Sequence, residues 1–91
     1  MKQTRLRIHG QVQGVYYRSS AQQKAQELGL TGWVRNEPDG TVTAVALGPE
    51  AALEEWVKWC QTGPKRAIVT QIDREDMPPE NFTDFEIKNN N

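Results

Sequence analysis

The chain of 91 residues is the size of one small domain, so we expect residues 1–91 to form a single unit with no second domain. Eleven Lys and Arg residues against twelve Asp and Glu residues give a net charge of −1, which excludes a general electrostatic attraction to nucleic acid or to membranes. One cysteine excludes an internal disulfide bond, and the sequence has neither an apolar run of about 20 residues nor the apolar core of a signal peptide, so we expect a cytoplasmic protein.

Residues 4–12 are predicted to form a half-buried strand, because polar and apolar side chains alternate along them. A tight loop is expected over 13–18. A helix is predicted over 20–29, because Ser19 or Ser20 can cap its first turn and apolar residues recur at helical spacing after it.

Two further strands are predicted at 31–37 and 41–47, on either side of the turn 38–40. The turn is indicated by Pro-Asp-Gly, since proline presets its φ angle and glycine accepts a positive one. A second helix is expected to begin at 48–50 and to end at the Gly-Pro pair 63–64.

The remaining chain predicts a strand over 67–73, an irregular loop over 75–81, a last short strand over 82–87 and a frayed tail over 89–91. Short loops and right-handed crossovers favour one sheet for this βαββαβ order, with both helices on one face. We therefore predict a ferredoxin-like α+β sandwich, with a mainly antiparallel sheet and a short extra C-terminal strand. The position of that last strand in the sheet stays open.

The segment 10–18 is a candidate anion site. A strand enters a glycine-containing loop that leads directly into a helix, where backbone N–H groups can converge on one anion. Arg18 follows at the start of the helix, and its planar guanidinium can pair with two phosphate oxygens. On this pattern alone, Gly14 can equally be a simple turn residue and Arg18 a surface arginine.

Asn36 is a second candidate, at the end of a predicted strand. Its ordinary role there is that of a turn residue whose side chain hydrogen-bonds the nearby backbone. Its functional role would be to hold a water molecule, because a carboxamide both donates and accepts hydrogen bonds.

Two stretches resemble the signatures of the acylphosphatase family. GQVQGVYYR, from Gly10 to Arg18, resembles the first, and GWVRNEPDGTV, which begins at Gly32 and is followed by Gly48, resembles the second. One departure is visible, because Tyr17 stands where the family usually has phenylalanine. If this hydroxyl is buried, it needs a hydrogen-bond partner.

The resemblance implies an enzyme that hydrolyses the carboxyl–phosphate anhydride of small acyl phosphates, without a metal, a cofactor or a phosphoenzyme. It implies that Arg18 binds the phosphoryl group and that Asn36 positions the attacking water. The backbone loop expected to bind phosphate consists of Gln13, Gly14, Val15, Tyr16, Tyr17 and Arg18. The expected partner is a small acyl phosphate, with no nucleic acid or membrane, and we expect a monomer.

Other residue types give weaker candidates. We expect His9 to be a surface residue, Cys60 to lie in the core, and the acidic residues at 73–76 to lie in a solvated loop. An RNA-binding module is disfavoured, because residues 6–13 and 41–47 contain no aromatic side chain on which a base could stack. A non-catalytic phosphate- or anion-binding domain of the same fold is the alternative that stays open.

Overall fold

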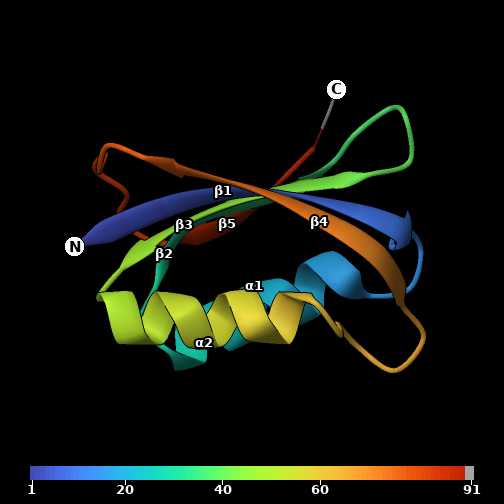
Figure 1. Ribbon diagram of the computed structural model, residues 1–91, viewed down its shortest axis with the longest axis horizontal. Helices are drawn as coiled ribbons and strands as arrows, with labels where there is room; N and C mark the ends of the chain where they lie inside the picture. Colours follow the sequence, from blue (N-terminus) through green and yellow to red (C-terminus); the bar gives the residue numbers. More distant parts are fainter. Residues whose placement is uncertain (90–91) are drawn as a thin grey trace.

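The computed structural model describes residues 1–89 as two layers, a five-stranded sheet and two helices that cover one of its faces (Figure 1). The predicted element order and the ferredoxin-like fold class are confirmed. The elements in chain order are β1 (Lys2–Gln11), α1 (Tyr17–Glu27), β2 (Thr31–Asn36), β3 (Val42–Gly48), α2 (Glu50–Cys60), β4 (Ile68–Met77) and β5 (Phe85–Lys88).

The sheet has the strand order β4-β1-β3-β2-β5. The pairs β1–β3, β1–β4 and β2–β3 are antiparallel, whereas β5 pairs with β2 in parallel and forms one edge of the sheet. This pairing settles the position of the last strand. The end of β1 and the hairpin that joins β2 to β3 lie at the same end of the molecule (Figure 1).

The core lies between the sheet and the helices. Alternate residues of the inner strands point toward the helices and are almost completely buried, and the apolar faces of α1 and α2 cover them. Trp56 is the largest of these side chains, and its indole Nε1 donates a hydrogen bond to the carbonyl of Ala21, which ties α2 to α1 at 3.1 Å. The buried core includes Leu6, Ile8, Val34, Val42, Ala44, Ala46, Ala21, Ala25, Leu53, Trp56, Val57, Cys60 and Phe85.

The start of α1 differs from the prediction. The helix begins at Tyr17 and has no side-chain cap, because Tyr16 enters it in the left-handed conformation, with φ 66°. The hydroxyl of Ser19 donates to the carbonyl of Tyr16 and does not accept from a backbone N–H. The serine cap was therefore wrong, and the first N–H groups of α1 are left without a capping side chain.

The C-terminal third also differs in its boundaries. The prediction of a loop from residue 75 was wrong for its first residues, since β4 continues to Met77. The strand is longer because β1 supplies pairing partners as far as Gln3. The exposed acidic residues of this region therefore lie on a strand. Residues 82–84, predicted as strand, precede β5. The predicted tail 89–91 falls outside the described residues except for Asn89.

Gly10 occupies a position in β1 where a side chain does not fit. The pairing with β4 shifts by one residue between His9 and Gly10, and Gly10 has φ 125°. A Cβ atom at Gly10 would lie 2.0 Å from the carbonyl oxygen of Ile68. Gly10 therefore lies against the backbone of β4, shortly before the loop that follows β1.

Replacement of Gly10 by alanine is expected to lower the free energy of unfolding by about 3 kcal/mol or more, because strain at φ adds to a clash with backbone. Urea denaturation measures the loss. Gly29→Ala is the matched control, since Gly29 also has positive φ but open space around it, and strain alone costs about 1–2 kcal/mol. Equal losses in the two variants would contradict the proposed backbone clash.

Candidate functional site

A cavity of about 310 Å³ lies where the end of β1, the first turn of α1 and the edge strand β5 meet. Its lining combines apolar and aromatic residues with an arginine, a serine and a glycine. The lining residues are Val12, Gly14, Tyr16, Tyr17, Arg18, Ser19 and Ile87. The segment predicted from the sequence as an anion site therefore lines a cavity.

The loop between β1 and α1 has an unusual backbone. Gly14 has φ 74° and Tyr16 has φ 66°, and Tyr16 is the one residue other than glycine with positive φ among those described. For a bulky side chain this conformation costs about 1–2 kcal/mol. Packing of the Tyr16 ring does not offset this cost, because the ring is exposed. Left-handed residues followed by right-handed ones turn neighbouring N–H groups toward one concave side, where an anion can bind.

The backbone N–H groups of this loop are available as donors in the described part of the chain. Within residues 1–89, no hydrogen bond uses the backbone N–H groups of Gln13, Gly14, Val15 and Tyr16. The uncapped first turn of α1 adds further donors and the positive end of the helix dipole. The loop and the helix start therefore offer several donors to an anion.

Arg18 lies on the first turn of α1 and lines the same cavity. Its side chain is half-buried, and no carboxylate in the described part of the chain forms an ion pair with it. A partly buried guanidinium without a protein counter-ion gains most from an anionic ligand.

Asn36 is the last residue of β2 and lies opposite Val42 of β3. Alternation along β2 puts it on the same sheet face as Val34, the face that α1 and α2 cover. Its side-chain oxygen Oδ1 is buried. Asn36 does not line the cavity beside Arg18, but β5 joins the two regions, because Ile87 lines the cavity and pairs with Val34.

The hairpin after Asn36 is held by a polar network that the sequence analysis did not identify. The hydroxyl of Thr43 donates to the carboxylate of Glu37 at 2.6 Å, and Arg35 donates to it at 3.2 Å. The hydrogen bond from Thr43 is the main reason that the pKa of the Glu37 carboxyl lies below its ordinary value, and the hydrogen bond from Arg35 contributes less. The network fixes the end of β2, where Asn36 lies.

Tyr17 has the partner that its hydroxyl requires. The hydroxyl donates to the backbone carbonyl of Cys60 at 2.7 Å, in the buried interior between α1 and the end of α2. Burial, followed by the proximity of Cys60, raises the pKa of the Tyr17 phenol, so the group stays neutral and acts as a donor. This hydrogen bond satisfies a carbonyl of the last turn of α2.

Substitution of Tyr17 by phenylalanine, the usual residue of the resembled signature, is expected to lower the free energy of unfolding by about 1–2 kcal/mol, since it leaves the Cys60 carbonyl buried without this donor. Chemical denaturation measures the change. Tyr16→Phe is the control, because that ring is exposed, and a change below about 0.5 kcal/mol is expected there. A Tyr17→Phe variant as stable as the parent would rule out this role.

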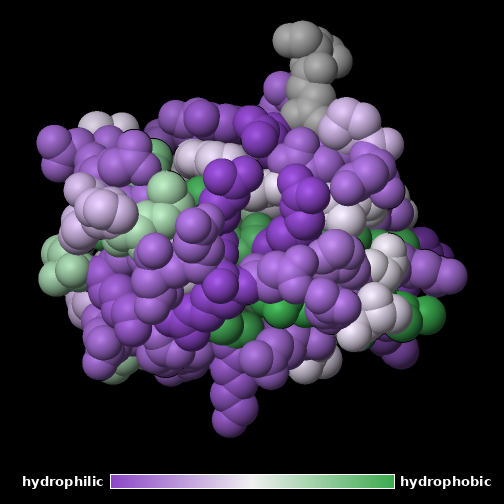
Figure 2. Space-filling view, turned by 45° about the horizontal axis from the view of Figure 1, so that its top comes forward, coloured by the Kyte–Doolittle hydropathy of each residue, from purple (hydrophilic) through white to green (hydrophobic). Residues whose placement is uncertain are grey.

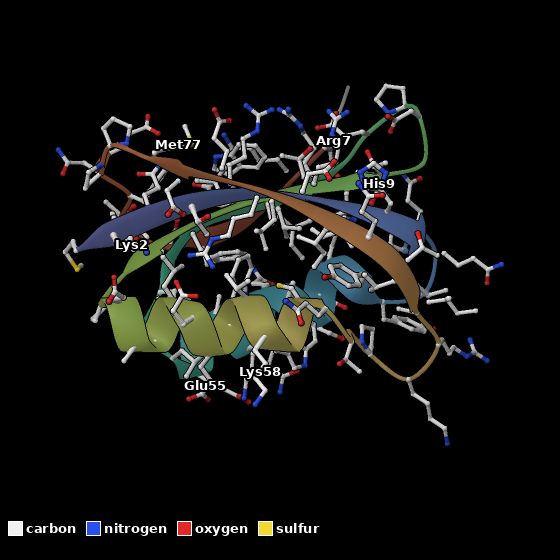
Figure 3. All side chains as sticks on the ribbon, in the orientation of Figure 1. Lys2, Arg7, His9, Glu55, Lys58 and Met77 are labelled. Atoms are coloured by element: carbon white, nitrogen blue, oxygen red, sulfur yellow. The ribbon has the colours of Figure 1, made fainter. Side chains whose placement is uncertain are left out.

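The weaker candidates fall outside the cavity. His9 is a surface residue as predicted, and its Nε2 lies 2.8 Å from Asp73 Oδ2 on the neighbouring strand. Arg7, on the same strand, points to the sheet face away from the helices (Figure 3), and Figure 2 shows a mainly hydrophilic surface there. Cys60 is fully buried, as expected.

Two further properties concern residues 1–89. No group of three or more His, Cys, Asp or Glu side chains is placed to hold a metal ion. Neither helix in this part of the chain has the length and apolarity needed to cross a membrane.

The sequence did not identify two of the residues that line the cavity. Val12 lies within the candidate segment 10–18 but was not named as a binding residue, and Ile87 comes from a strand whose place in the sheet was open. No local signal marks Ile87, because parallel pairing with β2 is what brings it to the cavity.

Comparisons with known proteins show which family the chain resembles over most of its length. The family model described as Acylphosphatase matches residues 4–87. The chain is 53% identical over 81 residues to an acylphosphatase from Marinobacter nauticus, covering 88% of each protein. It is 49% identical over 88 residues to an acylphosphatase from Methylococcus capsulatus, covering 96% of each. It is also similar to the crystal structure of acylphosphatase from Bacillus subtilis, with a TM-score of 0.94, 37% identity, and coverage of 97% of this chain and 99% of the other.

Proposed function

The chain belongs to the acylphosphatase family, and on this premise we propose that it hydrolyses small acyl phosphates by direct attack of water on a phosphoryl group held at the cavity. The observation that carries the proposal is a group of four loop N–H donors that make no hydrogen bond within residues 1–89, next to the Arg18 guanidinium, which has no carboxylate partner among these residues. Such an arrangement is complementary to a phosphoryl group.

Arg18 and the loop 13–18 hold the phosphoryl group in this proposal. The donors of Gln13, Gly14, Val15 and Tyr16 surround its oxygens, and the first turn of α1 adds the N–H groups of Tyr17 and Arg18. Charge on these oxygens is what a phosphoryl-transfer transition state requires the protein to stabilise. Each well-directed donor can contribute about 3 kcal/mol to this stabilisation.

Asn36 orients the attacking water. Its carboxamide can accept from the water and donate to it, which fixes the direction of the lone pair toward phosphorus. The water oxygen forms a bond to phosphorus as the bond from phosphorus to the acyl oxygen breaks. The carboxylate departs with the electron pair, and a phosphate oxygen takes the proton from the water.

This route requires no general acid and no metal ion. A carboxylate is a good leaving group at neutral pH, so its departure does not depend on protonation by an enzyme side chain. His9 is the one histidine of the chain. It lies on β1, contacts Asp73 on β4, and does not line the cavity. The proposed reaction therefore uses Arg18, the loop and Asn36, and it assigns no role to the histidine.

Hydrolysis of benzoyl phosphate, followed continuously in the presence of a chelator, tests the proposal. We expect turnover that the chelator does not reduce, with competitive inhibition by inorganic phosphate. The alternative function is a non-catalytic phosphate-binding domain of the same fold, and phosphate binding without any hydrolysis would favour it. Residues 1–91 as one domain, the monomeric state and the cytoplasmic location stay predictions.

A further inference from the structure

The side chain of Gln13 leaves the loop after β1 and reaches the β2–β3 hairpin. Its Nε2 atom donates to the carbonyl of Glu37 at 2.8 Å and to the carbonyl of Thr41 at 2.9 Å. The two donor protons of the amide are thus both used. These contacts join segments that are 24 and 28 residues apart in the sequence.

The two acceptors are the residues that close the hairpin. The N–H of Glu37 donates to the carbonyl of Thr41 at 2.8 Å, and Glu37 directly follows Asn36. The side chain of Gln13 therefore binds the base of the hairpin, immediately after the residue proposed to hold water. Among the described residues, no other side-chain hydrogen bond joins the loop 12–16 to this hairpin.

We propose that Gln13 is a positioning residue that sets the placement of the phosphate-binding loop relative to Asn36. This inference rests on the proposed function, in which the loop holds phosphorus and Asn36 holds the water. In-line attack needs the two reacting atoms at about 3–3.5 Å, and a misplacement of about 1 Å can cost about a hundredfold in rate. One amide that joins both halves of the site controls that separation.

Gln13 is exposed, so water can replace its amide at the two carbonyls when the side chain is truncated, and the expected loss of folding free energy is small. Its backbone N–H also remains when the side chain is truncated, and the donors for the phosphoryl group are unchanged. Removal of the side chain should therefore affect the chemical step more than either phosphate binding or stability. A residue with a purely structural role would not give this pattern.

The test compares Gln13→Ala with Gln26→Ala, in which an exposed glutamine of α1 outside the candidate anion site is truncated. For Gln13→Ala we expect kcat for benzoyl phosphate to fall about tenfold, with the inhibition constant of inorganic phosphate and the unfolding midpoint almost unchanged. Gln26→Ala should match the parent chain. Gln13→Glu, which keeps the size but cannot donate to the two carbonyls, should not restore kcat.

The double variant separates the two proposals. If Gln13 acts through Asn36, adding Gln13→Ala to Asn36→Ala should change kcat by less than about twofold. A full tenfold loss in that background, or a Gln13→Ala variant with the kcat of the parent, overturns the inference and leaves the proposed function standing. A parent chain without hydrolysis overturns the proposed function, and this inference with it.

Discussion

Replacement of Arg18 by alanine is expected to lower kcat/KM for benzoyl phosphate by about 10³-fold or more, since it removes the one cationic side chain that lines the cavity in the described structure. Inhibition by inorganic phosphate should weaken in parallel. Because no carboxylate pairs with Arg18 within residues 1–89, the substitution leaves no uncompensated acidic partner, and the variant should fold. Steady-state kinetics and phosphate titration measure both effects.

Lysine at position 18 should fail to restore the activity. It keeps the charge but replaces a planar fork by a single point charge, which cannot bind two phosphate oxygens side by side. Arg66→Ala is the matched control, because Arg66 is an exposed arginine on the turn before β4 and does not line the cavity. An Arg18→Lys variant with the turnover of the parent chain would show that charge alone is sufficient.

Asn36→Ala is expected to lower kcat by about a hundredfold while the affinity for inorganic phosphate persists. Asn36 supplies none of the proposed phosphate donors, so its loss affects the nucleophile and not the anion. The contrast with Arg18→Ala, which should reduce both quantities, separates the two roles. Turnover and phosphate inhibition are to be measured on the same preparation.

The control for Asn36 is Asn81→Ala, since Asn81 is an exposed asparagine in the loop between β4 and β5. It should keep the parent kcat. Full activity in Asn36→Ala would remove the water-positioning role. A parallel loss of phosphate affinity would instead place Asn36 in the anion site.

The topology was predictable because its signals are local. Period-two and helical patterns identified the strands and helices in order, and the Pro-Asp-Gly turn at 38–40 identified the hairpin. The position of β5 was not predictable, because its partner β2 lies about fifty residues earlier. The length of β4 was underestimated for the same reason, since β1 determines it.

The site was predictable only in part. A glycine loop followed by an arginine at a helix start indicated an anion site, and the structure brings Gly14 and Arg18 to one cavity. The serine cap failed because Tyr16 enters the helix in a left-handed conformation that no residue pattern marks for tyrosine. The need of the Tyr17 hydroxyl for a partner was foreseen, but the Cys60 carbonyl is 43 residues away in the sequence.

Gln13 shows what sequence patterns omit. A polar residue in an exposed loop has no periodicity and no unusual type, and it was assigned only a backbone role. Its side chain has two acceptors only because the hairpin folds back to the end of β1. The placement of Asn36 relative to the cavity likewise depends on sheet register, which local sequence does not encode.

The most direct test of the central claim is hydrolysis of benzoyl phosphate in ¹⁸O-labelled water with a chelator present, followed by mass spectrometry of both products. Attack of water on a phosphoryl group held by Arg18 and the loop predicts that the label enters phosphate and that benzoate stays unlabelled, at a rate that the chelator does not change. Label in benzoate, which requires attack at the carbonyl carbon, or hydrolysis abolished by the chelator would contradict the account.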